Sequence, residues 1–238
     1  MSNPNVFKSP WHFDNFREDQ EGEYVKIVGR FVGDWTNEIA LLRSDLVSHF
    51  HDKAYNKQGY GHAANKPSEG HKEEDALNPD GNPSAKIFSH FKFKGYEDQL
   101  PKIQAMTDFL AYDLDKPFTK KLDDQMPNDQ LMWHIDNLPG NPTKERVFDP
   151  NFKYQPPEML RFLIMLEDHH PGQIAQFGNI VYTQWRAGTI FAWDWSTLPH
   201  VTWNGSWHKR MALQLTGTGT QTTWDIVAKG HKHAEYKV

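Results

Sequence analysis

Two histidines and one carboxylate in this chain have the types and the order needed to form a metal site. His134 and Asp136 lie two residues apart in a strand-like run, and His200 lies further along the chain. Alternate residues of a strand share a face, so His134 and Asp136 could bind one ion together. Two imidazoles and one carboxylate suit Fe(II) and leave metal positions open for oxygen and a co-substrate. Arg210, ten residues after His200, could clamp the carboxylate of that co-substrate.

The His-x-acid spacing alone is weak evidence for this site. Similar pairs begin at His12, His71 and His233. Only the pair at His134 combines a strand-like context with a matching histidine downstream, so the context selects it. His208 is a rival for the second histidine and ranks below His200.

A hairpin around Asn204-Gly205 is expected to bring His200 and Arg210 together, because Asn-Gly is a strong hairpin signal. A register with one extra loop residue pairs Trp203 with Trp207 and His200 with Arg210. In that register, alternate side chains of the second strand point to opposite faces of the sheet. Arg210, Ala212 and Gln214 point inward, and Met211, Leu213 and Leu215 point outward against helices.

The elements that must position these residues are mostly short strands. From residue 118 onward, apolar runs alternate with turn signals, which is typical of a barrel or a sandwich. Before them we expect a strand over 24–33, helices over about 36–50 and from Pro101, and a strand over 87–93. We interpret the chain as one domain, with residues 1–117 bracing a core over 118–228 and a tail at 229–238. A polar run at about 51–86 is a surface insertion or an active-site lid.

Composition limits the classes of partner. The net charge is −5, which disfavours a nucleic-acid substrate. The chain has no cysteine, so a metal must use His, Asp or Glu. With no signal-like or membrane-length apolar run, we expect a cytoplasmic protein that does not bind a membrane. The oligomeric state stays open.

The set His134-x-Asp136, His200 and Arg210 resembles the Fe(II)/2-oxoglutarate-dependent oxygenase superfamily over residues 118–224. The resemblance implies a mostly β fold with flanking helices and a double-stranded β-helix core, the jelly roll of cupin-like proteins. It also implies that the first three residues bind Fe(II) and that Arg210 binds the distal carboxylate of 2-oxoglutarate.

One position departs from the family pattern. Many members carry Ser or Thr two residues after the arginine, where this chain has Ala212. Another donor must then share the carboxylate, and four candidates stay open: Tyr182, Gln173, Gln184 and Arg161. Arg161 is also a candidate for binding substrate, as is Trp195, which follows the strand that precedes His200.

The resemblance implies a dioxygenase that hydroxylates or oxidatively demethylates a small molecule or a peptide side chain, with release of succinate and CO2. The alternative is a cupin-like metalloprotein without oxygenase activity, such as an isomerase or a ligand-binding module. Arg210 favours the oxygenase, because an isomerase has no need of a carboxylate clamp at this spacing.

Overall fold

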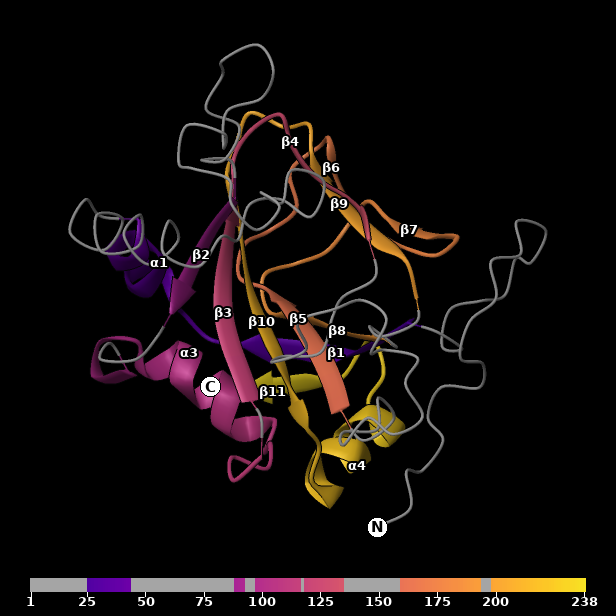
Figure 1. The fold of residues 1–238 in the computed structure, drawn as a ribbon. Helices are drawn as coiled ribbons and strands as arrows, with labels where there is room; N and C mark the ends of the chain where they lie inside the picture. The colour runs from indigo at the N-terminus through magenta and orange to yellow at the C-terminus, as the bar shows by residue number, and fades with distance from the viewer. Residues whose placement is uncertain (1–24, 44–87, 93–96, 117, 135–158, 194–197) are drawn as a thin grey trace, which may run out of the picture.

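The computed structural model of this chain describes residues 25–43, 88–92, 97–116, 118–134, 159–193 and 198–238. Within these ranges, two sheets face each other and three helices lie around the larger one (Figure 1). The larger sheet has the strand order β11-β1-β8-β5-β10-β3-β2, and the smaller has the order β4-β9-β6-β7. The strands are β1 (Val25–Val32), β2 (Phe88–Lys92), β3 (Phe118–Gln125), β4 (Asp129–His134), β5 (Met159–Met165), β6 (Gln173–Phe177), β7 (Ile180–Tyr182), β8 (Thr189–Trp193), β9 (His200–Asn204), β10 (Arg210–Thr218) and β11 (Glu235–Lys237).

The eight strands β3 to β10 form a double-stranded β-helix. Consecutive strands alternate between the two sheets, except that β6 and β7 pair with each other in the smaller one. This gives two facing four-stranded layers, β3-β10-β5-β8 and β4-β9-β6-β7, which is the arrangement of jelly rolls and cupins. The predicted fold class is confirmed.

Two apolar clusters follow from the alternation of side chains along the central strands. Every residue of β5 and β10 is buried, because one face of these strands packs against the helices and the other against the smaller sheet. Met211, Leu213 and Leu215 pack in the helix-side cluster, as predicted. Ala212 packs in the second cluster, between the sheets, which we call the roll interior.

The described residues also contain three α-helices and a 3-10 turn: α1 (Thr36–Leu42), η3 (Glu97–Gln99), α3 (Pro101–Phe109) and α4 (Gln221–Lys229). Pro101 begins α3, where a missing backbone N–H costs nothing. The N-cap residue of α1 is Trp35, whose side chain makes no capping hydrogen bond. Asp34 instead accepts a hydrogen bond from the Thr36 N–H.

Some elements differ from the sequence interpretation. The expected tail contains β11, which pairs in parallel with β1. Helix α4 was not predicted, although Thr220 and Thr223 cap its start reciprocally. The insertion at about 51–86 lies outside the described residues. Within the part of the chain that the structure describes, no helix has the length and apolar character needed to cross a membrane.

The predicted hairpin between β9 and β10 is wrong. β9 pairs with β4 and β6 in the smaller sheet, whereas β10 pairs with β3 and β5 in the larger one. Residues 205–209 therefore cross from one sheet to the other. Gly205 donates its N–H to the carbonyl of Gly172, which holds the crossing against the turn before β6.

Candidate metal and co-substrate site

The two candidate histidines lie opposite each other in paired strands. His134 is the last residue of β4 and His200 is the first residue of β9, and the antiparallel register pairs them directly. Directly opposed positions in an antiparallel pair have Cβ atoms roughly 5 Å apart. That separation is short enough for two side chains to bind one ion, so the backbone brings together the two positions that the sequence proposed.

His200 points into the roll interior and its ring is held there. Its side chain is 5% exposed, and the ring centroid lies 5.2 Å from that of Trp193 and 6.1 Å from that of Phe177. Nδ1 lies 3.0 Å from the carbonyl oxygen of Leu198. A carbonyl can only accept, so Nδ1 is the donor in this contact, and in the neutral ring with this tautomer Nε2 is the nitrogen that has the lone pair. This is the tautomer that a ligand binding through Nε2 requires.

Two of the predicted site residues, Asp136 and Trp195, lie outside the described residues. Within the ranges that the structure does describe, no group of three His, Asp or Glu side chains comes together to hold a metal. The proposed third ligand therefore stays a prediction.

Arg210 begins β10 at the other end of the roll from His200. Its side chain is 4% exposed, Nη1 donates to the carbonyl oxygen of Ile174 over 3.2 Å, and Cζ lies 5.8 Å from the ring centroid of Trp185. In β6, Ile174 lies three residues before Phe177, the residue paired with His200. At about 3.3 Å per residue, the guanidinium lies about 10 Å along the strands from the His200 level. The cation is thus inside the roll but displaced from the histidine pair.

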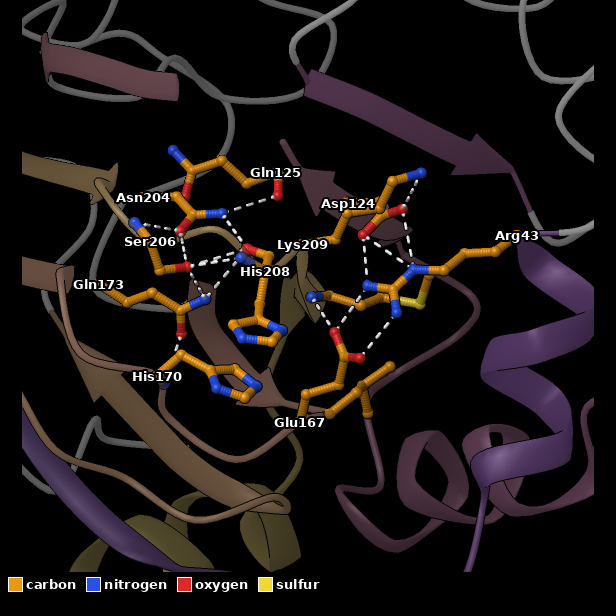
Figure 2. Close-up of polar contacts among 12 residues, drawn as sticks. Arg43, Asp124, Gln125, Glu167, His170, Gln173, Asn204, Ser206, His208 and Lys209 are labelled. Carbon is orange, nitrogen blue, oxygen red and sulfur yellow. Dashed lines mark hydrogen bonds and ion pairs between the residues drawn. The ribbon is translucent and has the colours of Figure 1, made fainter. Parts of the chain in front are cut away.

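Among the candidates for a second carboxylate donor, Gln173 is buried and its amide contacts the crossing segment. Nε2 donates to Ser206 Oγ over 3.2 Å, and Oε1 accepts the N–H of His170 (Figure 2). Ser206 in turn bonds Asn204, whose amide also donates to the backbone carbonyl of His208. The amide of Gln173 therefore fixes the chain that leads into Arg210.

Two further candidates for this donor, Tyr182 and Gln184, differ in burial. Tyr182 lies in the roll interior against Phe177 and Phe191, whereas Gln184 is exposed.

Sequence reasoning missed a further donor, Trp185. It is 8% exposed, packs beside Arg210, and its Nε1 has no hydrogen-bond partner among the described residues. No spacing signal in the sequence marks Trp185, because its proximity to Arg210 depends on the two sheets facing each other.

Arg161 lies at the histidine end of the roll. It is paired with Trp193 on one side and with Thr216 on the other. Its Nε donates to Thr216 Oγ1 over 2.7 Å, and Cζ lies 5.9 Å from the Trp193 ring centroid. Thr216 was also missed, although it continues the inward series Arg210, Ala212, Gln214 by the same period of two.

His208, the rival ligand, is exposed and lies away from His200. Its ring stacks on that of His170, with centroids 3.8 Å apart, beside the turn before β6. In that turn the Gln173 N–H donates to the His170 carbonyl, and Gly172 has a φ of +96°, as the third residue of a type II turn requires. His208 therefore belongs to the surface of the crossing segment.

Comparisons with known proteins identify likenesses of fold. No family model and no curated protein matches the sequence. A Pseudomonas putida prolyl-4-hydroxylase matches over 56% of this chain and 70% of its own, with 13% identity and a TM-score of 0.37. The cupin domain of an XRE family transcriptional regulator from Enterobacter cloacae matches over 46% and 90%, with 9% identity and a TM-score of 0.31. A predicted oxalate decarboxylase from Thermotoga maritima matches over 55% and 80%, with 10% identity and a TM-score of 0.32. Such likenesses carry no information on chemistry, and the jelly-roll assignment rests on the strand order.

Proposed function

We propose that this protein is an Fe(II)- and 2-oxoglutarate-dependent dioxygenase, which hydroxylates or oxidatively demethylates a small molecule or a peptide side chain. The observation that carries the proposal is the pairing of His134 with His200 at one end of the roll, with the Arg210 guanidinium inside the same roll about 10 Å further along. A histidine pair and a buried cation at this separation suit a co-substrate that binds a metal at one end and a cation at the other.

The donor set fits Fe(II). Imidazole and carboxylate are ligands that this ion accepts, and the Nδ1 hydrogen bond of His200 to Leu198 prepares Nε2 for binding. His134, Asp136 and His200 would hold the ion. When bound, Fe(II) would supply an oxidation by O2 in which one oxygen atom enters succinate as 2-oxoglutarate loses CO2 and the other is transferred to the substrate.

Arg210 would bind the distal carboxylate of 2-oxoglutarate. The carbonyl of Ile174 and the ring of Trp185 hold the guanidinium in place, so little side-chain freedom is lost when the carboxylate binds. The Trp185 indole N–H is a buried donor beside this cation. We propose that it shares the carboxylate, in place of the hydroxyl that Ala212 cannot provide.

Aromatic side chains around His200 would keep water from the reaction. Phe177, Phe191 and Trp193 are buried in the roll interior and adjoin one another. A dry environment strengthens the hydrogen bonds of buried charged groups and limits side reactions. The role of these residues is thus exclusion and orientation.

The test is turnover of 2-oxoglutarate by the full chain with Fe(II) and ascorbate under air. We expect succinate release without added substrate, and none without Fe(II), without O2 or in His200→Ala. The exposed His208→Ala variant is the control and should match the wild type. Metal binding with no succinate from the wild type would overturn the oxygenase and favour a cupin-like metalloprotein such as an isomerase.

A further inference from the structure

A second arginine, Arg161, lies on the interior face of the roll and is not used by the co-substrate site. The residues that alternate with it along β5, Met159 and Leu163, pack in the interior cluster, whereas Leu160 and Phe162 pack on the helix side. Arg161 is 5% exposed. A guanidinium on this face has several N–H donors directed into the roll interior or its walls, and such a group can hold an anion.

Arg161 lies close to the proposed metal position. Its guanidinium contacts the Trp193 ring, and the same ring lies 5.2 Å from that of His200, centroid to centroid. A single side chain therefore separates the cation from a proposed iron ligand. The hydrogen bond from Nε to Thr216 Oγ1 fixes the plane of the guanidinium at this level of the roll.

A neighbouring donor gives independent support. Trp193 is 2% exposed, and its Nε1 has no hydrogen-bond partner among the residues described. A buried N–H without an acceptor costs free energy. The guanidinium lies 5.9 Å from the centroid of the same ring, so an oxyanion bound between the two groups could accept hydrogen bonds from both, and we call them the donor pair.

This donor pair cannot serve the co-substrate carboxylate assigned to Arg210. The partner of Arg161 in β10 is Thr216, six residues beyond Arg210 and hence about 20 Å away along the strand. The Arg210 guanidinium turns toward Ile174, whereas that of Arg161 stays at Thr216. A short dicarboxylate bound at Arg210 and at the metal would leave Arg161 on the other side of the histidine pair.

We propose that Arg161 and the Trp193 N–H bind a carboxylate of the prime substrate, so that this protein oxidises carboxylate-bearing molecules. The inference rests on the proposed function and adds a substrate class to it. Ion pairing to Arg161 would anchor the substrate beside His200, with the carbon to be oxidised directed at the metal. A neutral analogue of the same shape would lose the charged hydrogen bonds and bind more weakly.

The experiment uses the full chain loaded anaerobically with Fe(II) and 2-oxoglutarate, which gives a visible charge-transfer band if the proposed function is right. Acetate and propionate are then titrated against acetamide and propionamide, and the perturbation of the band is followed. We expect a saturable response to the carboxylates at concentrations at least about tenfold below those of the amides, the factor that one lost charged hydrogen bond produces.

Variants distinguish the loss of either donor from a loss of folding. Arg161→Gln and Trp193→Phe should each reduce the preference for carboxylate over amide to less than about threefold, and Arg161→Lys should restore part of it. Thr216→Val, which keeps the charge and removes the acceptor of Nε, should weaken the preference without changing the affinity for 2-oxoglutarate. Thermal unfolding checks that each variant is folded.

The failures of the two proposals are distinguishable. If the wild type forms no band, the proposed function is wrong. If the band forms but carboxylates perturb it no more than amides do, or perturb it equally in Arg161→Gln, the substrate class proposed here is wrong.

Discussion

His134 at the end of β4 is paired with His200 at the start of β9, and the two strands belong to the smaller sheet of the jelly roll. The register of this pair, rather than a local motif, sets the separation of the two histidine positions. On the opposite side of β9, the same His200 is paired with Phe177 of β6. His200 is thus paired with a residue of a neighbouring strand on each side.

Arg210→Gln should weaken the binding of 2-oxoglutarate. The substitution removes the buried cation and the charged hydrogen bonds proposed to the carboxylate, so we expect KM for 2-oxoglutarate to rise by at least about tenfold, with a smaller change in kcat. Steady-state succinate release measures both. Arg210→Lys should recover part of the affinity, and the exposed Lys209→Gln should leave KM unchanged. An unchanged KM in Arg210→Gln would refute the assigned role.

Trp185→Phe tests the donor proposed to replace the missing hydroxyl at Ala212. The variant keeps the ring beside Arg210 and removes the indole N–H. We expect a rise of about three- to tenfold in KM for 2-oxoglutarate, corresponding to one hydrogen bond. Ala212→Ser should partly compensate in the double variant, since it restores a hydroxyl near the same carboxylate. Additive effects in the double variant would argue against a shared carboxylate.

Arg43 should contribute more to stability than a surface arginine does. At the end of α1 it makes paired hydrogen bonds to Asp124 of β3 and to Glu167 after β5, with the shortest contact to each at 2.7 Å (Figure 2). Burial alone would lower the pKa of the guanidinium, but the bonds to the two carboxylates outweigh it and raise the pKa. We expect Arg43→Met to cost about 1–3 kcal/mol, a range reduced for the partial exposure of the three side chains. Urea denaturation gives the value.

The matched control for Arg43 is Arg30→Met. It removes the pair of Arg30 with Glu235, in which the acidic side chain is 57% exposed. Exposed pairs contribute about 0–1 kcal/mol, so this variant should be close to the wild type. Equal losses in both variants would mean that the network around Arg43 is no stronger than a surface ion pair.

Tyr112 should make the protein sensitive to alkaline pH. Its hydroxyl lies within hydrogen-bond distance of the carbonyls of Leu160 and Leu215, and burial raises the pKa of this phenol more than nearby Arg161 lowers it. A pKa raised in the folded state means that the unfolded state loses its proton first. Stability should therefore fall as pH rises above about 10, by up to about 1.4 kcal/mol per pH unit for this one group.

Tyr112→Phe isolates that effect. The variant should lose about 1 kcal/mol at pH 7 and show a shallower decline of the unfolding free energy between pH 9.5 and pH 11, at about these values. Denaturation in urea across this range gives both slopes. Parallel slopes for the variant and the wild type would show that other groups control the alkaline transition.

The sequence predicted the parts of the fold that depend on local patterns. The alternation in β10 gave the correct faces for Met211 and Ala212. The predicted partner of β9 was wrong. The Asn204 amide donates to the carbonyls of Gln125 and His208, and these bonds stabilise a crossing between the sheets rather than a hairpin. An Asn-Gly pair carries no information on which sheet the next strand joins.

The same difference between local patterns and long-range pairing applies to the candidate site. Residue types identified His200 and Arg210, and both are buried in the roll interior. The donors Trp185 and Trp193 could not be found in this way, because their positions beside the two arginines depend on pairing between strands distant in sequence. Long-range pairing in a jelly roll is decided by the packing of the whole core, which no short window of sequence contains.

The most direct test of the account is the visible absorption of the full chain on anaerobic addition of Fe(II) and then 2-oxoglutarate. We predict a weak charge-transfer band in the wild type and in His208→Ala, and no band in His134→Ala or His200→Ala. A band that persists in both of these ligand variants, or a wild-type spectrum unaffected by 2-oxoglutarate, would contradict it.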